Sequence, residues 1–461
     1  MTTTKNITLL KKTNVHKAFL ALVLPTILSQ LIAIIYNMSD SFWIGQLNNS
    51  AQFAAVFLCV PAFLVLVGIS NIFGVGGASL IARCLGVQDL QKARATSAFC
   101  LWSTILCSIL YGLLFYVARS TILHLIGASS ETYLYCEQYV FWTVVLGGIP
   151  GALTGLFGHL IRSEGYAKQA SFGMILGLLL NVVLDPIFIF WFKLEIVGAA
   201  VATVLSMCIG CLYFIYFLLT HAHSSVLTLN PKYYRIKNHI ASEVLWVGLP
   251  STLITFMAIL SNIVLNVLTA SYSTAAVAGM GVAKRIDHII FSITNGIGQG
   301  ALPLIAYNYA AKNFKRMKGA IRIALTYSLS FAVSITICLF FGAHWITTIF
   351  IQDPATISYG IKFLKIICLT CPCFALSLII LILFQAMGQK TQPIFLSLLR
   401  KGGLDIPLMY ILNQHFGVMG VAWALPIEDV MASIIACLLF WLFWKKNNQK
   451  NKKIAIHKNV C

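Results

Sequence analysis

The chain has 461 residues, of which 59% are hydrophobic and only 10% are charged, and its mean hydropathy is +0.87. A soluble domain needs more polar surface than this composition supplies. Apolar stretches longer than about 18 residues are typical of membrane-spanning helices. Such stretches take up nearly the whole chain, which leaves no room for a soluble catalytic domain. The composition therefore excludes a soluble enzyme and predicts an all-α integral membrane protein.

Twelve spans are predicted from the apolar stretches. They cover residues 18–45, 52–81, 95–118, 131–160, 168–192, 196–220, 240–271, 275–304, 320–348, 355–387, 391–414 and 417–444. We expect two pseudo-symmetric lobes of six helices, with cytosolic segments before, between and after them. The predicted parts are a cytosolic N-terminal segment at 1–17, an N-lobe at 18–220, an inter-lobe linker at 221–239, a C-lobe at 240–444 and a basic cytosolic tail at 445–461.

The net charge of +19 would suggest a nucleic-acid partner in a soluble protein, but its distribution indicates topology instead. With the N-terminus inside, 26 of the 32 Lys and Arg residues fall on inner segments or in the inner half of an adjoining span. This asymmetry follows the positive-inside rule, so both termini are expected in the cytosol. The basic inner face also favours anionic lipid headgroups. We therefore predict membrane lipids as partners, no nucleic acid, and a monomer.

Polar side chains interrupt the apolar stretches at a few positions. Asp40 lies deep in the first span, and Asn181 and Asp185 lie four residues apart in the fifth. A charge at bilayer depth costs roughly 3 kcal/mol even on lenient scales, so such a carboxylate is a candidate functional residue.

The spacing of these residues predicts one polar cluster. Tyr36 and Asp40, like Asn181 and Asp185, are four residues apart and share a helix face. At about 1.5 Å per residue, Asp185 lies about 26 Å and Asp40 about 33 Å from the cytosolic ends of their helices, and Thr203 lies about 10 Å from the outer end of the sixth span. All five residues are therefore expected in the outer half of the N-lobe.

Two functions fit this cluster, and a third interpretation is structural. Two carboxylates held close in a low dielectric cannot both stay ionised cheaply, so one is expected to carry a proton. The oxygens of Asp40, Asn181, Asp185 and Thr203 could instead coordinate Na⁺. The sequence does not choose between H⁺ and Na⁺ as the coupling ion, and no other metal or cofactor is expected. Alternatively, the polar residues only hold helices together.

Pro25 is predicted to act as a hinge in the first span, because it removes a backbone hydrogen bond and permits a kink. Bending of this helix on protonation would link cation occupancy to the shape of the cavity. Pro250 at the corresponding position of the second half favours the alternative, a shared structural kink.

The second half of the chain matches the first at an offset near 220–225. The matching landmarks include Leu24-Pro25 with Leu249-Pro250, Leu184-Asp185 with Leu404-Asp405, and Gly198-x-Ala200-x-Ala202 with Gly420-x-Ala422-x-Ala424. Six spans per copy insert both halves in the same orientation, which is common in secondary transporters that rock one half against the other.

The second half has charged candidates of its own near mid-depth, namely Lys284, Arg285, Asp287, Asp405, Glu428 and Asp429. One interpretation is a self-neutralising network, in which three of the four acids pair with Lys284, Arg285 and protonated His288. In the other, an unpaired acid attracts cationic substrates or relays protons. Asp405 is favoured for that role because it is the repeat counterpart of Asp185.

Several segments together resemble the multidrug and toxic compound extrusion (MATE) transporters. They are Asp40-Ser-Phe-Trp-Ile-Gly45, Gly76-Gly-Ala-Ser-Leu-Ile-Ala-Arg83, Asn181-Val-Val-Leu-Asp185-Pro186, Gly198-Ala-Ala-Val-Ala-Thr203 and Pro303-Leu-Ile-Ala-Tyr-Asn308. The resemblance covers residues 15–445. It implies two six-helix lobes and export of amphipathic, often cationic compounds in exchange for H⁺ or Na⁺.

The resemblance also bears on the branch and on the alternatives. It favours the bacterial branch with its cation site in the N-lobe, and hence the bacterial inner membrane. The other bacterial branch carries a Glu in the seventh span and an Asp in the tenth, and here both spans lack a carboxylate within their membrane portion. The alternative within transport is a flippase of a lipid-linked precursor. A membrane enzyme is not expected, because the chain has no HExxH, GxSxG or GxGD motif.

Overall fold

A computed structural model describes residues 5–47, 49–236, 239–350 and 353–458 of the chain. Parts of three predicted segments therefore lie outside the described residues. These parts are residues 1–4 of the N-terminal segment, residues 237–238 of the linker and residues 459–461 of the tail.

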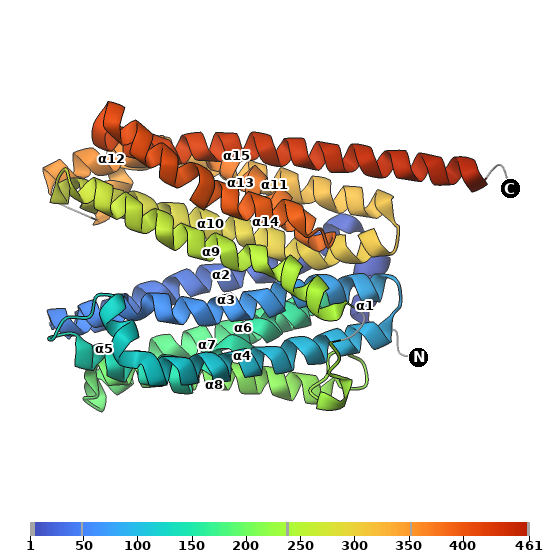
Figure 1. Ribbon diagram of the computed structural model, residues 1–461, viewed down its shortest axis with the longest axis horizontal. Helices are drawn as coiled ribbons and strands as arrows, with labels where there is room; N and C mark the ends of the chain where they lie inside the picture. The colour runs from blue at the N-terminus through green and yellow to red at the C-terminus, as the bar shows by residue number, and fades with distance from the viewer. Residues whose placement is uncertain (1–4, 48, 237–238, 351–352, 459–461) are drawn as a thin grey trace. The chain divides into compact units, whose positions relative to one another are not determined.

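The described residues are almost entirely helical (Figure 1). The first half contains α1 (Lys5–Lys11), α2 (Val15–Gly45), α3 (Ser50–Gly86), α4 (Leu90–Leu125), α5 (Tyr133–Val140), η1 (Phe141–Leu146), α6 (Gly148–Ser163), α7 (Ala167–Pro186), η2 (Ile187–Trp191), α8 (Glu195–Thr220) and η3 (Pro231–Tyr233). The second half contains α9 (Ile240–Ala270), α10 (Thr274–Ala310), α11 (Phe314–Phe350), α12 (Pro354–Cys368), α13 (Cys371–Ala386), α14 (Thr391–Leu398), η4 (Leu399–Asp405) and α15 (Ile406–Lys458).

Nine of the described helical stretches are long and apolar enough to cross a membrane. Two bent pairs, α5–η1 with α6 and α12 with α13, pass the same test with bends of 51° and 49°. The last stretch, Thr391–Lys446, is 56 residues long and is broken at Gly417, whose φ of 60° ends one helix and starts another. Counting each bent pair as one span and this stretch as two gives the predicted twelve spans. The all-α membrane architecture is confirmed.

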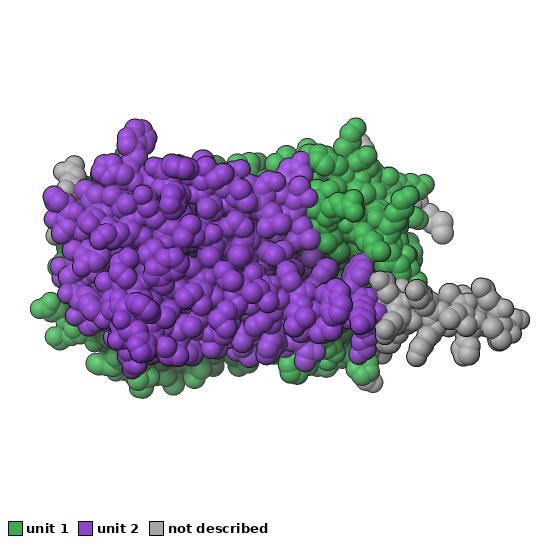
Figure 2. Space-filling model, turned by 90° about the horizontal axis from the view of Figure 1, so that it is seen from above, with its two compact units in different colours: residues 1–255, 296–323, 385–390 green, residues 256–295, 324–384, 391–461 purple. Residues whose placement is uncertain are grey.

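Two compact units can be recognised from the contacts within the chain (Figure 2). Unit 1 comprises residues 1–255, 296–323 and 385–390, and unit 2 comprises residues 256–295, 324–384 and 391–461. Unit 1 thus contains the predicted N-lobe together with parts of α9, α10 and α11 and the residues that follow α13. The predicted division into lobes at residues 220–240 stays a prediction.

Helix packing in unit 1 places α7 between two neighbours. It packs along α2 on one side and along α8 on the other. A buried apolar cluster, which includes Ile44, Leu66, Val140 and Ile196, joins the nearby ends of α2, α3, α5 and α8. Polar residues on the facing sides of α2, α7 and α8 are therefore brought together.

Two π-helical segments occupy related positions in the two halves. In the first half, α7 passes into η2 directly after Asp185-Pro186, and in the second half η4 ends at Asp405. Short π-helical turns inside α-helices are rare and are frequent at functional sites. The repeat counterparts Asp185 and Asp405 thus both adjoin this kind of distortion.

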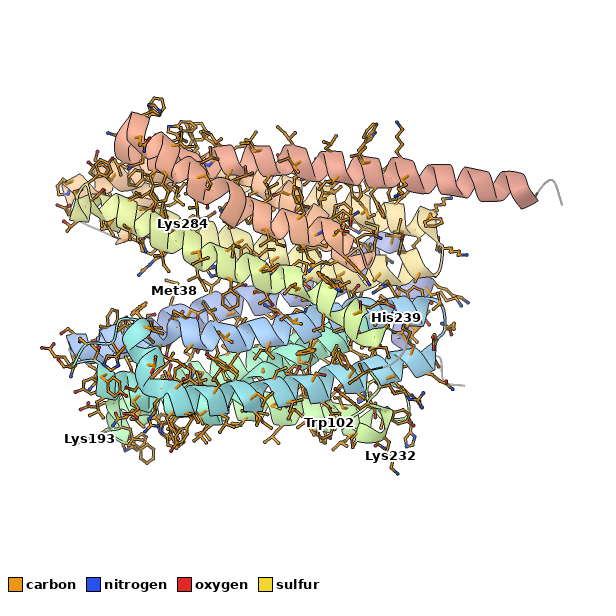
Figure 3. All side chains as sticks on the ribbon, in the orientation of Figure 1. Met38, Trp102, Lys193, Lys232, His239 and Lys284 are labelled. Atoms are coloured by element: carbon orange, nitrogen blue, oxygen red, sulfur yellow. The ribbon has the colours of Figure 1, made fainter. Side chains whose placement is uncertain are left out.

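The predicted inter-lobe linker docks on unit 1. The Glu164 carboxylate, which is 4% exposed at the end of α6, accepts hydrogen bonds from the Ser225 hydroxyl and the Val226 backbone N–H, each 2.6 Å long. Tyr234 stacks on Phe99 of α4. Lys232 of this linker and Lys193, which follows η2, lie at opposite ends of the helices of unit 1 (Figure 3). This arrangement agrees with the predicted topology, whose orientation stays a prediction.

We expect Glu164 to make linker docking sensitive to pH. Burial raises the pKa of this carboxyl to about 7 from its ordinary value near 4.5, despite the two hydrogen bonds that favour its charged form. The folded protein therefore holds this proton more tightly than the unfolded chain does, and Glu164 costs stability as the pH rises from about 4.5 to about 7. The midpoint of thermal unfolding should fall less between pH 5 and 8 in Glu164→Gln than in the natural protein. Equal falls would contradict this account.

Candidate functional site

The polar cluster predicted in the first half is present in unit 1. The Asn181 amide on α7 donates a hydrogen bond of 3.2 Å to the Thr203 hydroxyl on α8. Asn181, Asp185 and Thr203 are 2%, 0% and 4% exposed. The face of α7 that carries Asn181 and Asp185 is therefore turned away from the surface of the unit, as the four-residue spacing predicts.

Helix α2 supplies the other two predicted residues. The Tyr36 hydroxyl interacts with Thr203, and its ring lies within electrostatic range of Asp40 and Asp185. Asp40 in turn lies within electrostatic range of Asp185. The structure thus brings all five predicted residues together between α2, α7 and α8.

Four carboxylate and amide oxygens in this cluster lack a hydrogen-bond donor among the described residues. They are both side-chain oxygens of Asp185 and the Oδ1 atoms of Asp40 and Asn181, and all four are buried. Asn181 lies beside Asp185, but its amide group is directed to Thr203. Buried acceptors left without a donor are rare in folded proteins, because each one costs roughly 1–3 kcal/mol. Gathered in one place, they form a site suited to a proton or a small cation.

Sequence reasoning missed one member of the cluster. Tyr139 on α5 lies within electrostatic range of Tyr36, Asp40 and Asp185. Its phenolic O–H group adds a donor beside the two carboxylates. No spacing rule within one helix relates α5 to α2, so Tyr139 could not be identified from the sequence.

Pro25 lies inside α2, away from the cluster. The helix runs without interruption from Val15 to Gly45. Fifteen residues separate Pro25 from Asp40, which is about 22 Å of helix, so Pro25 cannot touch the carboxylates. Its predicted role as a hinge stays a prediction.

The charged candidates of unit 2 pair differently from the predicted network. Arg400 binds Glu428 through Nε and Asp429 through Nη2, each at 3.2 Å. Lys401 Nζ lies 3.0 Å from Glu428 and 3.3 Å from Asp405. Asp405 also accepts a 2.6 Å hydrogen bond from the Ser261 hydroxyl. The predicted pairing of these acids with Lys284, Arg285 and His288 is therefore wrong for all but Asp287.

Only the pair on α10 was predicted correctly among these contacts. Lys284 forms an ion pair with Asp287 one turn along the helix (Figure 3 labels Lys284). Arg285 and His288 are exposed. Arg400 and Lys401 lie inside the predicted span 391–414, where η4 carries them beside buried acids. The four-residue spacing of Lys401 and Asp405 was the signal that could have revealed this pairing.

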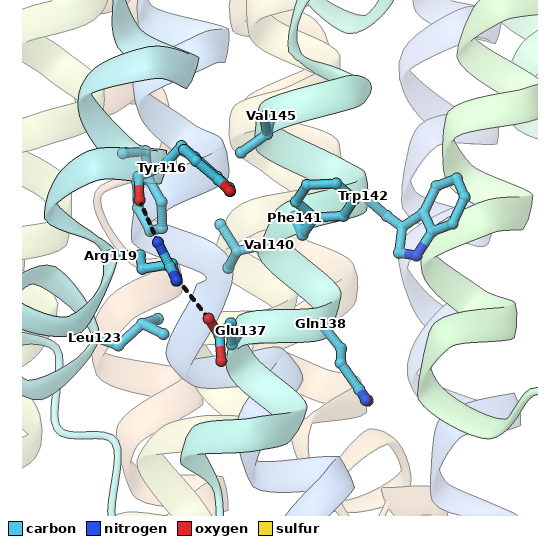
Figure 4. A pocket seen from close by; sticks show the side chains of 10 residues that line it. Tyr116, Arg119, Leu123, Glu137, Gln138, Val140, Phe141, Trp142 and Val145 are labelled. Atoms are coloured by element: carbon cyan, nitrogen blue, oxygen red, sulfur yellow. Dashed lines mark hydrogen bonds and ion pairs between the residues drawn. The ribbon is translucent and has the colours of Figure 1, made fainter.

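A pocket of about 280 Å³ lies elsewhere in unit 1, between α4 and the α5–η1 helix (Figure 4). Tyr116, Arg119, Glu137 and Trp142 are among the residues that line it. Arg119 donates to Glu137 at 2.6 Å, so the two charges in this pocket neutralise each other. The pocket does not include the polar cluster, and we assign it no role.

Comparison with known proteins agrees with this architecture. The MatE family model matches the chain twice, over residues 25–187 and again over residues 250–411. The chain belongs to the MatE family. The two matches also establish the internal repeat, because they begin at Pro25 and Pro250 and end shortly after Asp185 and Asp405.

Relatives match along nearly the whole length of this MatE protein. The multidrug export protein MepA of Staphylococcus saprophyticus is 30% identical over 434 residues, which are 94% of this chain and 95% of that protein. MepA of Staphylococcus aureus strain NCTC 8325 is 30% identical over 436 residues, with the same coverage. A MATE transporter crystallised in the straight conformation has a TM-score of 0.91 at 23% identity, and covers 97% of this chain and all of its own.

These findings decide several of the predictions. The predicted family, the twelve-span fold and the membrane-transporter class are confirmed, and the chain is not an enzyme. Transport in this family is coupled to ions, and the flippase alternative is not favoured. The protein is a multi-pass membrane protein with small molecules as its substrates.

Proposed function

We propose that this MatE protein exports amphipathic, often cationic compounds in exchange for H⁺ or Na⁺, across a bacterial cytoplasmic membrane with both termini inside. The observation that carries the proposal is the cluster of buried oxygens without donors on α2 and α7. The names of the staphylococcal relatives, which are multidrug export proteins, support the choice of substrates.

The chemistry of the cluster supports a cation-exchange step. With a cation bound, the charges of Asp40 and Asp185 are compensated. After its release two carboxylates on different helices face each other, and their repulsion in a low dielectric disfavours that arrangement of α2 and α7. A ligand shifts a conformational equilibrium only by its difference in affinity for the two states. Because the cluster joins three helices, a change in their packing alters its cation affinity directly.

The two candidate ions make different demands on the site. A proton needs one carboxylate oxygen, and the hydroxyls of Tyr36 and Tyr139 can hydrogen-bond the carboxylate that stays ionised. Sodium needs several oxygens at once, which Asp40, Asn181, Asp185 and Thr203 could supply together. A proton would need fewer of these side chains than Na⁺ would. The side chains that Na⁺ would need are also present in the cluster.

Two measurements on everted membrane vesicles separate these ions. Efflux of a fluorescent cationic dye is followed while the pH gradient is collapsed at constant Na⁺, and then while the Na⁺ gradient is collapsed at constant pH. We expect efflux to stop in one of the two experiments. Efflux that continues in both, and in their combination, would contradict cation-coupled export.

A further inference from the structure

The internal repeat relates the polar cluster of unit 1 to the charged network of unit 2. With the offset of Leu184-Asp185 and Leu404-Asp405, Asn181 corresponds to Lys401. With the offset of Leu24-Pro25 and Leu249-Pro250, Tyr36 corresponds to Ser261. Three features thus recur in both units. They are a buried acid, a polar side chain four positions before it, and a hydroxyl on the first helix of that half.

The contacts in unit 2 follow this correspondence. Asp405 is fully buried, and its Oδ2 atom receives the Ser261 hydroxyl at 2.6 Å and the Lys401 ammonium at 3.3 Å. In unit 1, Asp185 is fully buried and interacts with Tyr36 and Asn181. At the position one turn before the buried acid, a neutral amide stands in the first site where an ammonium group stands in the second.

The ammonium group of Lys401 is placed as a bound cation would be. It lies between two buried carboxylates, 3.0 Å from Glu428 and 3.3 Å from Asp405. Arg400 binds the other oxygen of Glu428 and the Oδ1 atom of Asp429, and the Thr370 hydroxyl donates to the Oδ2 atom of Asp429. Without Lys401, Arg400 alone would have to balance the negative charges of Asp405, Glu428 and Asp429. The Oδ1 atom of Asp405 is buried and has no donor among the described residues, so the site still has an oxygen free for a ligand.

We propose that the second half of the protein contains a monovalent-cation site that is filled permanently by the Lys401 ammonium group. The proposal rests on the proposed cation exchange in the first half, whose site it mirrors. A tethered ammonium is present at a high effective concentration and cannot leave, so it excludes H⁺ and Na⁺ from Asp405. One site therefore exchanges its cation during transport, while its counterpart keeps a constant charge.

The proposal predicts that Lys401→Asn reopens the second site, because it restores the amide found at Asn181. The probes are Na⁺, measured by equilibrium binding of the radioactive ion, and H⁺, measured by potentiometric titration of the purified protein. We expect the variant to bind one more cation per chain than the natural protein, and Lys401→Asn with Asp405→Asn to lose this gain. Lys401→Arg keeps a tethered cation and should show no gain.

Two results would overturn the proposal. One is a Lys401→Asn protein that binds no more cations than the natural protein. The other is a lower cation count in Asp405→Asn alone, which would mean that Asp405 already binds an exchangeable ion; this second experiment does not need Lys401→Asn to fold. Failure of the proposed function can be distinguished from failure of this proposal. If Asp185 binds no exchangeable cation, Asp185→Asn will bind as many cations per chain as the natural protein, whatever the result for Lys401→Asn.

Discussion

Asp185→Asn is expected to abolish cation-driven export while the protein still folds and inserts. The substitution keeps the shape of the side chain but removes its charge, so the cluster no longer gains and loses a cation with the conformational change. Dye efflux in everted vesicles should fall to the level of membranes without the protein. The amount of protein in the membrane should stay close to that of the natural chain, because a neutral amide costs less to bury than a carboxylate.

Asp89→Asn is the matched control for this experiment. Asp89 is the N-cap of α4, where its carboxylate accepts a hydrogen bond from the Lys92 backbone N–H. Asn and Asp cap helices about equally well, so the same change there should leave efflux intact. Undiminished efflux by Asp185→Asn would remove the case for a cation site at this residue.

Gly248→Ala is expected to have the second-largest effect, through packing alone. Helix α9 crosses α3 so closely that a Cβ atom at Gly248 would lie 1.9 Å from the Ile72 carbonyl oxygen. The Thr252 hydroxyl donates to the Gly68 carbonyl at 2.8 Å across the same pair of helices. Because backbone atoms cannot move aside locally, the added methyl group must push the helices apart. Overpacking of this kind costs typically about 1–3 kcal/mol, which disfavours the described packing by about fivefold to about a hundredfold.

Hydrogen–deuterium exchange gives the measurement for this variant. Peptides that cover residues 68–76 and 244–252 should exchange faster in Gly248→Ala, and dye efflux should fall. Gly281→Ala is the matched control, since a Cβ atom at that helical glycine would meet nothing within 4 Å. Two results would contradict the importance of this helix crossing. One is that Gly248→Ala leaves exchange in both peptides unchanged, and the other is that Gly281→Ala speeds exchange in them as much as Gly248→Ala does.

Much of the fold was predictable because hydrophobic length and positive charge are properties of single segments. The sequence showed the spans as apolar stretches, and the repeat followed from landmarks such as Pro25 and Pro250. The breaks inside spans were not predictable from hydropathy. The bend between α5–η1 and α6 lies within an apolar stretch, and the break at Gly417 depends on a positive φ that hydropathy does not register.

The site was predictable where its members share a helix and much less so where they come from different helices. The four-residue spacing of Asn181 and Asp185 predicted one shared face, and both side chains are buried on it. Tyr139 was missed because its helix reaches the cluster only through tertiary packing. The partners of Glu428 and Asp429 were assigned wrongly for the same reason: Arg400 lies far from them in sequence and next to them in space.

The two halves of the repeat keep part of the geometry around their buried acids. Asp185 and Asp405 both adjoin π-helical segments and are both fully buried. One difference between them is the residue one turn earlier, an amide in one half and an ammonium in the other. In the proposed account, this position separates a site that exchanges ions from one that holds a fixed charge.

The most direct test of cation exchange at α2, α7 and α8 is ion release from the purified protein on substrate binding. Ethidium, a cationic amphipathic dye, is added in weakly buffered solution while free H⁺ and Na⁺ are recorded. The natural protein should release a cation as ethidium binds, and Asp185→Asn should bind ethidium without releasing one. Equal release by the two proteins would show that the exchanged cation is held somewhere other than at Asp185.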